Sequence, residues 1–197
     1  MKAVRMPRHD ADLDMPVIKS YLAGDADSFN ELVGRYERLA YNLAYRMTGN
    51  SADAADLTQE IFVRLHRTLQ TFHGDSAFST WFYRLAANCC KDWLRKEARR
   101  PAIHEMKDTL IADGGTGPSQ HYEQKETKEL VQMAISALPE EQRVAVILHD
   151  LQGYSYEEIA TITEAPIGTV KSRLARARLK LAESLAAIKE QNGRLSV

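Results

Sequence analysis

The sequence predicts an all-α protein made of two small helical domains joined by an irregular linker. Apolar residues recur every three or four positions over long stretches, which is typical of amphipathic helices. No segment shows the sustained two-residue alternation of a half-buried strand. Glycine and proline are few, 10 and 6 in 197 residues, and they gather in short clusters that separate the periodic stretches.

The first domain is predicted from three apolar stripes. They run over residues 29–47, 54–72 and 78–94. Gly49 and Asn50 suit the end of the first of these helices, and Ser51 suits the N-cap of the second. A polar break at residues 73–76 precedes the third stripe. We therefore expect a helical domain over residues 25–101, preceded by an N-terminal tail and a short first helix over residues 1–24.

The linker and the second domain follow from a change in pattern. Periodic apolar residues almost disappear after Pro101, and glycine and proline cluster over residues 113–119. This composition predicts an irregular linker over residues 102–126, long enough to separate two domains. Helical periodicity resumes at Leu130. We expect the second domain over residues 127–190, followed by a tail over residues 191–197.

Composition and charge exclude several classes of protein. The chain has 26 Lys and Arg against 27 Asp and Glu, a net charge of −1, so it is neither a basic nucleic-acid coat nor an acidic tail protein. The longest unbroken apolar run, Val144–Leu148, is far shorter than the ~20 residues of a membrane-spanning helix. The first ten residues lack the apolar core of a signal peptide. These features predict a globular protein of the cytoplasm without direct membrane insertion.

Candidate enzyme and metal sites are missing from the sequence. Residues 114–117 lack the lysine and the preceding strand of a phosphate-binding loop, and the six histidines are scattered. Cys89 and Cys90 are neighbours that point about 100° apart on a helix. We expect one of them to be buried and inert and the other to be partly exposed. The sequence predicts no enzyme, no metal, no cofactor and no small-molecule substrate.

The second domain contains a predicted helix-turn-helix. Ser155 and Glu158 form a capping box, and Pro166 suits the first position of the next helix. The core stripe of that helix comprises Ile167, Val170, Leu174, Ala177 and Leu181. Five cations and no acid lie between residues 166 and 182, which favours a polyanion as ligand over the alternative, a solvated basic helix. We expect DNA contacts, in a major groove, from Gly168, Thr169, Lys171, Ser172, Arg173, Ala175, Arg176 and Arg178.

The first domain carries two further candidate surfaces. Asp53, Asp56, Gln59 and Glu60 share one helical face, which by itself is typical of a solvated helix start. Residues 72–83 place five aromatic side chains and a histidine around a Gly-Asp-Ser loop, and cations follow on the next helix. Aromatic faces beside cations suit single-stranded nucleic acid, although we favour the core for Trp81, Phe82 and Trp93.

Taken together in their order along the chain, these segments resemble the extracytoplasmic-function (ECF) sigma factors of bacterial RNA polymerase, especially the sigma-E type. The resemblance lies in residues 53–62 and 72–88 of the first domain and in residues 138–143, 153–160 and 168–178 of the second. It implies a transcription initiation factor that binds core RNA polymerase, reads the −35 and −10 promoter elements and assists promoter melting. The implied partners are the polymerase clamp coiled coil and flap, promoter DNA and an anti-sigma factor, which could hold the chain at the inner membrane face.

The resemblance also implies residue roles. Asp53, Asp56, Gln59 and Glu60 would dock on the clamp coiled coil, and the basic helix would read the −35 element. The −10 element and its separated strand would contact Phe72, His73, Gly74, Asp75, Ser76, Phe78, Arg84, Asn88, Lys91 and Arg95. Ala175 is small where some relatives carry a bulky side chain, so the −35 base preference does not carry over.

Two rival functions differ in what they explain. A dimeric helix-turn-helix repressor or response regulator would share the second domain but would leave residues 72–100 unexplained. A protein-binding adaptor, such as an anti-sigma antagonist, would not need the basic helix at residues 166–182.

Overall fold

A computed structural model describes residues 11–99 and 118–194, and within those ranges every regular element is a helix. The predicted all-α class is therefore confirmed for the described residues. The elements are α1 (Ala11–Leu22), α2 (Asp27–Thr48), α3 (Ser51–Thr68), the 3-10 turn η1 (Leu69–Thr71), α4 (Phe78–Glu97), α5 (Pro118–Ser136), α6 (Glu140–Val146), the π-helical turn η2 (Ile147–Leu151), α7 (Tyr156–Thr163) and α8 (Ile167–Arg194).

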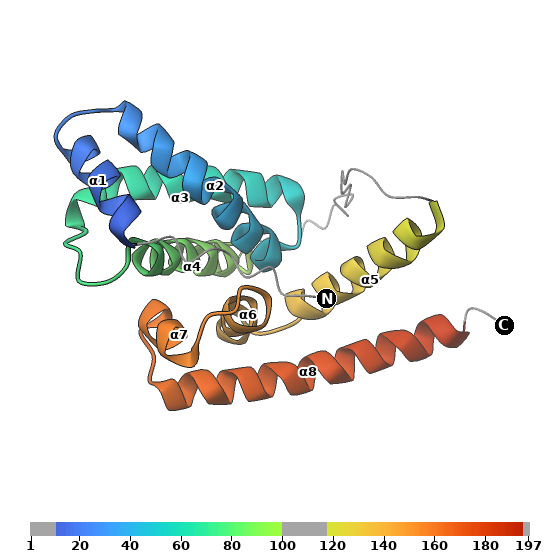
Figure 1. Cartoon of the computed structure of the whole chain (residues 1–197). Helices are drawn as coiled ribbons and strands as arrows, with labels where there is room; N and C mark the ends of the chain where they lie inside the picture. The colour runs from blue at the N-terminus through green and yellow to red at the C-terminus, as the bar shows by residue number, and fades with distance from the viewer. Residues whose placement is uncertain (1–10, 100–117, 195–197) are drawn as a thin grey trace.

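Helices α1–α4 form an N-terminal unit in which α2 contacts each of the other three helices (Figure 1). The predicted stripes supply its core, where Leu43, Leu57 and Ile61 are fully buried. Asn50, not Ser51, caps α3: its side chain accepts from the amides of Ala52 and Asp53 over 2.8 and 3.0 Å. Ser51 is instead the first helical residue, so the predicted N-cap was wrong by one position.

A buried carboxylate holds α1 on this unit. Asp14 is fully buried and accepts a hydrogen bond of 2.5 Å from the Tyr36 hydroxyl. Its other oxygen accepts from Nη1 of Arg35 over 3.0 Å, and the same guanidinium donates to the backbone oxygen of Leu13. Burial, and next the bond to Asp14, raises the pKa of Tyr36 well above its usual range. The hydroxyl therefore stays a donor at every physiological pH.

We expect Asp14→Ala to lower the free energy of unfolding by about 1–3 kcal/mol, since the Tyr36 hydroxyl and the Arg35 guanidinium would both lose the buried carboxylate to which they donate. Urea unfolding followed by circular dichroism measures the change. In the double variant with Tyr36→Phe, the buried hydroxyl is removed together with its carboxylate partner, so the loss should be smaller than the sum of the two single losses. Additive losses would show that the two side chains do not stabilise the unit as a pair.

Helices α5–α8 form a C-terminal unit whose core includes Val144, Leu148, Ile159 and Leu174. Three boundaries differ from the prediction. Helix α5 begins at Pro118, inside the predicted linker, and α8 continues to Arg194, inside the predicted tail. Pro166 precedes α8 by one residue rather than opening it, and its carbonyl accepts from the amides of Thr169 and Val170. The rest of the predicted linker, residues 102–117, lies outside the described residues.

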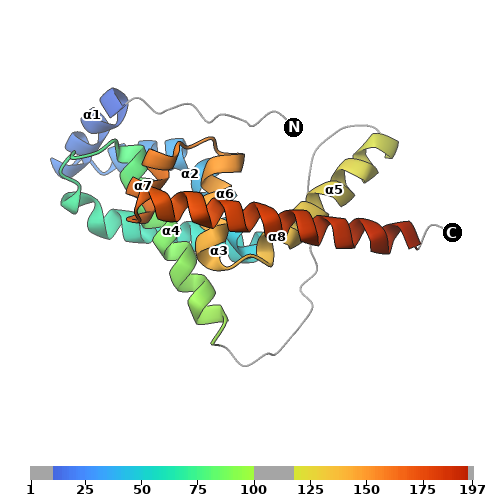
Figure 2. The same ribbon diagram turned by 90° about the horizontal axis from the view of Figure 1, so that it is seen from below.

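The two units pack against each other, with α6 and α7 between α4 and α8 (Figures 1 and 2). The C-terminal end of α2 meets α5 and α6. Gln132 donates to the carbonyl of Arg46 over 3.1 Å, and buried Arg143 donates to the carbonyl of Met47. Carbonyls in the last turn of a helix have no partner within that helix. These two side chains of the other unit therefore satisfy the carbonyls at the end of α2.

Gly49 makes this close approach possible. Its φ of +76° is left-handed, and a Cβ at this position would lie 2.9 Å from Oγ of Ser136. The predicted glycine end of α2 is thus confirmed, and its lack of a side chain also serves the contact between the units.

Candidate nucleic-acid interface

The acidic face of α3 is open to solvent. Asp56, Gln59 and Glu60 are exposed, and Asp53 is half-buried in the first turn. Glu60 lies 3.8 Å from Arg64, which in turn donates to Asp92 of α4 over 3.0 Å. The structure therefore brings the four predicted residues together on one accessible surface.

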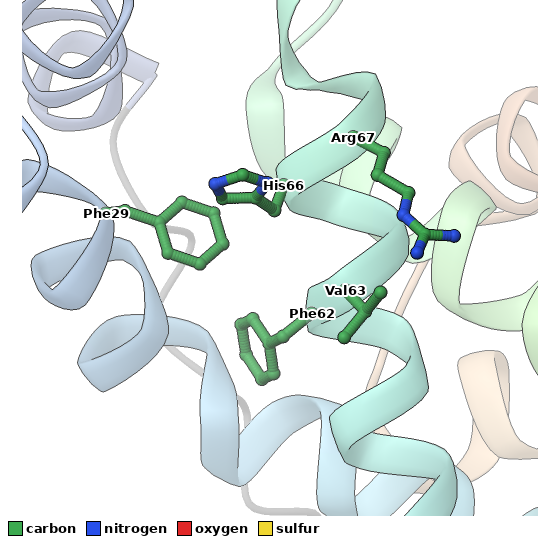
Figure 3. A pocket seen from close by; sticks show the side chains of 5 residues that line it. All are labelled: Phe29, Phe62, Val63, His66 and Arg67. Atoms are coloured by element: carbon green, nitrogen blue, oxygen red, sulfur yellow. The ribbon is translucent and has the colours of Figure 1, made fainter. Parts of the chain in front are cut away.

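A shallow hollow continues this face, and the sequence reasoning missed it. Phe29 of α2 and Phe62, Val63, His66 and Arg67 of α3 line it (Figure 3). His66 meets Phe29 edge to face with ring centroids 5.2 Å apart, and Val63 is 49% exposed. Val63 follows Gln59 by one helical turn, so an apolar contact site adjoins the acids. The signal in the sequence was that Val63 is apolar but does not fit the spacing of the buried stripe over residues 54–72.

The loop before α4 is polar, exposed and held at both ends. His73, Gly74 and Asp75 are exposed, and Ser76 is half-buried, as expected for a loop that does not belong to the core. Gly74 has a φ of +85°, which favours glycine, so the sharp bend depends on that residue. The loop thus presents polar side chains and backbone groups to solvent.

Phe72 and Phe78 lie beneath this loop rather than on its surface. They are 7% and 1% exposed, with ring centroids 5.3 Å apart, and Phe78 contacts Tyr36 edge to face. Neither ring can stack on a base in this arrangement, so their predicted place in the DNA site is corrected to support of the loop. Phe82 is fully buried as predicted, whereas Trp81 and Trp93 are only partly buried.

Four predicted strand-facing residues share one side of α4, because positions 84, 88, 91 and 95 are spaced by four, three and four. Asn88 is half-buried. The other three side chains pair with acids of the C-terminal unit. Arg84 donates to Glu164 over 3.0 Å, Lys91 lies 3.5 Å from Glu141, and Arg95 donates to Glu140 over 2.8 Å. None of these pairs was predicted from the sequence.

The predicted helix-turn-helix is present in α7 and α8. The capping box of Ser155 and Glu158 is complete, with both reciprocal hydrogen bonds. The core stripe of α8 is confirmed at Val170, Leu174 and Ala177, but Ile167 is 40% exposed and so does not belong to the core.

The outward face of α8 is accessible. The exposed members are Gly168, Lys171, Ala175, Arg176 and Arg178, and the half-buried ones are Thr169, Ser172 and Arg173. Two of the cations have acidic partners within the unit: Arg173 lies 3.1 Å from Glu141, and Arg178 donates to Asp150 over 3.1 Å. The ammonium of Lys171 lies 5.6 Å from the centre of the Tyr156 ring. Arg176 is exposed on the same side of α8 as Gly168, Ser172 and Ala175.

Both cysteines are buried, at 1% and 0% exposure, so the predicted partly exposed thiol was wrong. Burial raises the pKa of Cys89 to about 11 and raises that of Cys90 further above its usual range. Both thiols are therefore protonated at neutral pH. In the described ranges, no cluster of three or more His, Cys, Asp or Glu side chains could hold a metal ion, and no helix has the length and apolarity that a membrane span requires.

Comparison with known proteins identifies the two units. The sigma-70 region 2 family model matches residues 32–100, and the sigma-70 region 4 family model matches residues 128–181. The chain is 39% identical to the ECF RNA polymerase sigma-E factor of Escherichia coli strain K12, over 84% of this chain and 90% of the relative. The chain belongs to the ECF sigma factors of the sigma-70 family. The sigma-E factor of Haemophilus influenzae is 36% identical over 84% of this chain and 91% of its own length.

Solved structures agree with this membership. The sigma factor RpoE of Bartonella quintana, in complex with the anti-sigma factor NepR, superposes with a TM-score of 0.62 and 25% identity, over 82% of this chain and 98% of that chain. CnrH in complex with the cytosolic domain of CnrY has the same fold, with a TM-score of 0.63, 24% identity and coverage of 90% and 97%. Sigma factors initiate transcription at specific promoters, so the function that the resemblance implied is confirmed at this level.

Proposed function

We propose that this sigma factor binds its partners through three separate surfaces. The acidic face of α3 and the adjoining hollow bind the clamp coiled coil of core polymerase. The loop at residues 73–77, together with one side of α4, captures the separated strand of the −10 element. The outward face of α8 reads the −35 element. The observation that carries this proposal is that the predicted residues lie on three separate accessible or ion-paired surfaces, whereas the apolar stripes are buried.

The surface of α3 suits a protein partner of mixed character. Asp56, Gln59 and Glu60 provide acceptors and charge, and Val63 provides an exposed apolar contact one turn further along. Interfaces that combine a small apolar anchor with a polar rim are typical of specific protein–protein contacts.

We propose that region 4 contacts the polymerase flap.

The remaining roles are also part of the proposal. The chain acts without catalysis of its own, because the reaction belongs to the polymerase, and it works in the cytoplasm. The RpoE and CnrH structures are complexes with partners named as an anti-sigma factor and a cytosolic domain. By analogy, we propose that a comparable protein antagonist binds this chain.

Reconstituted transcription tests the proposal. Purified core polymerase with this chain should start RNA synthesis at defined positions on promoter-containing fragments, and core polymerase alone should not. A repressor or an adaptor would leave the start positions of core polymerase undefined. Co-elution of the chain with core polymerase in size-exclusion chromatography tests the first surface separately.

We expect Arg176→Ala to cost about 1–3 kcal/mol at one base position of the −35 element and to relax the preference there, as for a bidentate base contact. Arg178→Ala should weaken binding to every −35 sequence alike. It should also reduce the slope of log affinity against log salt concentration by about one, as expected for a phosphate contact. The measurement is the affinity of the full chain for a set of −35 duplexes that differ by single bases, at several salt concentrations. Equal losses on every duplex for both variants would contradict base reading by Arg176.

A further inference from the structure

Tyr156, the first residue of α7, contacts side chains of two neighbouring elements. The centroid of its ring lies 4.7 Å from that of His149 in η2, and the ammonium of Lys171 on α8 lies 5.6 Å from the centre of the same ring. Tyr156 is half-buried and packs against the core of the C-terminal unit, whereas Lys171 is exposed. A fixed aromatic face thus lies beside a cation that is open to solvent.

A second cation on the same side of α8 is held in a comparable way. Arg178 and Lys171 are about two helical turns apart, so both project from one side of the helix. Arg178 donates two hydrogen bonds to the carboxylate of Asp150 in η2, and Nδ1 of His149 lies 3.4 Å from the same carboxylate. The bonds to Asp150 hold the pKa of Arg178 above its ordinary value. One continuous chain of contacts therefore joins the two cations: Lys171, Tyr156, His149, Asp150 and Arg178.

We propose that Tyr156 is a positioning residue for DNA binding, whose ring holds the Lys171 ammonium at the edge of the outward face of α8, where a backbone phosphate would bind. This inference rests on the role proposed above for that face. In a helix-turn-helix, the first helix crosses the DNA backbone while the second lies in the major groove. A cation held against the first turn of α7 therefore lies on the side of α8 that faces the backbone.

The ring lowers the cost of the phosphate contact. A lysine side chain is long and flexible, so immobilising it when DNA binds costs affinity. The face of an aromatic ring attracts an ammonium group, so the side chain of Lys171 is already restricted in the free protein. One side of the ammonium faces the ring, and N–H donors on its other side stay available for a phosphate oxygen. Because Asp150 already holds Arg178, loss of the Tyr156 ring acts on Lys171.

The test is a double-mutant cycle on the affinity of the full chain for duplex DNA. Tyr156→Leu removes the ring, Tyr156→Phe keeps it, and Lys171→Ala removes the cation. Lys180→Ala is the matched control, because Lys180 is exposed on the opposite side of α8 from Lys171. Fluorescence anisotropy measures binding to a short duplex of mixed sequence and to a duplex that carries the −35 element of a mapped promoter, at several salt concentrations.

We expect Tyr156→Leu to weaken binding about threefold to tenfold, which is the cost of ordering one long side chain, while Tyr156→Phe stays close to the wild type. In the Lys171→Ala background, Tyr156→Leu should cause no further loss, whereas its full effect should remain in the Lys180→Ala background. Tyr156→Leu should leave the slope of log affinity against log salt concentration unchanged, because the number of cations is the same. Lys171→Ala should reduce that slope by about one.

Two results would overturn the inference. An equal effect of Tyr156→Leu in the Lys171→Ala and Lys180→Ala backgrounds would show that the ring has a general structural role. A loss in Tyr156→Phe as large as that in Tyr156→Leu would show that the hydroxyl contacts the DNA itself. Circular dichroism checks the fold of each variant, and Tyr156→Gln, which suits a half-exposed helical position, replaces Tyr156→Leu if that variant is unfolded.

Failure of the proposed function has a different signature. If the wild type binds the −35 duplex no better than the mixed-sequence duplex, reading of the −35 element by α8 is refuted. The cycle on the mixed-sequence duplex then still decides the role of Tyr156, because phosphate contacts do not depend on base sequence. A clear preference of the wild type for the −35 duplex, together with additive losses in the cycle, would refute the positioning role alone.

Discussion

Alanine at Asp75, Ser76 or Asn88 is expected to abolish open complexes on duplex promoters while polymerase binding stays nearly normal. Each base that leaves the stack costs a few kcal/mol, and a pocket that binds the extruded edge must offset that cost. Asp75 is exposed and Ser76 half-buried in a loop whose bend depends on Gly74 and whose ends are fixed by buried phenylalanines. Because both ends of the loop are fixed by buried rings, we expect that the loop does not rearrange to replace a polar contact that is lost.

Permanganate reactivity of the −10 thymines measures this effect. Wild-type holoenzyme should make them reactive, and the three variants should not. Gln70→Ala is the matched control, since Gln70 is exposed just before the loop and lies outside the proposed site. A promoter with a pre-melted bubble should partly rescue variants that only impair opening. Equal reactivity for wild type and variants would show that the loop is a connector and that melting is driven elsewhere.

The second large effect concerns core polymerase. Glu60→Lys, or Gln59→Ala to a smaller extent, should weaken polymerase binding without altering the fold. Glu60 is exposed, and its contact with Arg64 is a surface pair that contributes little to stability. Reversing a charge in a protein–protein interface removes one favourable contact and adds a repulsive one, so we expect a loss on the order of tenfold or more for Glu60→Lys.

Competition between labelled wild-type chain and each variant for core polymerase measures the loss. Glu157→Lys is the control, because it makes the same charge change on an exposed acid of region 4. Circular dichroism establishes that the helices are intact. Unchanged affinity for Glu60→Lys with an intact fold would contradict the assignment of the α3 face.

The helices and their buried stripes were predictable because the signal is local. Side chains at steps of three and four report one face of one helix, and the capping box at Ser155 lies within four residues. The exact cap of α3 was not predictable, since Asn50 and Ser51 are both good caps and only the backbone decides between them. The start of α5 was missed because few apolar residues follow Pro118, so its sequence lacks the periodicity that predicts a helix.

Contacts between the regions were beyond the reach of the sequence. Arg84 and Glu164 are 80 positions apart, and Arg95 and Glu140 are 45 apart, so no spacing rule relates them. The burial of both cysteines was also missed. Helix α4 contacts α1, α2, α3, α6 and α7, so two adjacent positions on it can both be buried. A single amphipathic stripe predicts one buried face only.

The assignment of three surfaces on one chain also explains why the polar residues of region 2 do not form a single patch. The acids lie on α3 and the polar loop lies at residues 73–77, and both are accessible, so under this proposal one partner can hold the first surface while another binds the second. Simultaneous binding of polymerase and DNA is what promoter-specific initiation requires.

Mapping of transcript 5′ ends tests the central claim most directly. Core RNA polymerase, with or without this chain, would transcribe fragmented genomic DNA of the source organism in vitro. We predict that the chain produces a discrete set of start sites that share one −35 element and one −10 element, and that Arg176→Ala relaxes a single base position of the −35 element. Start sites unchanged from those of core polymerase alone, or without shared upstream elements, would contradict the account.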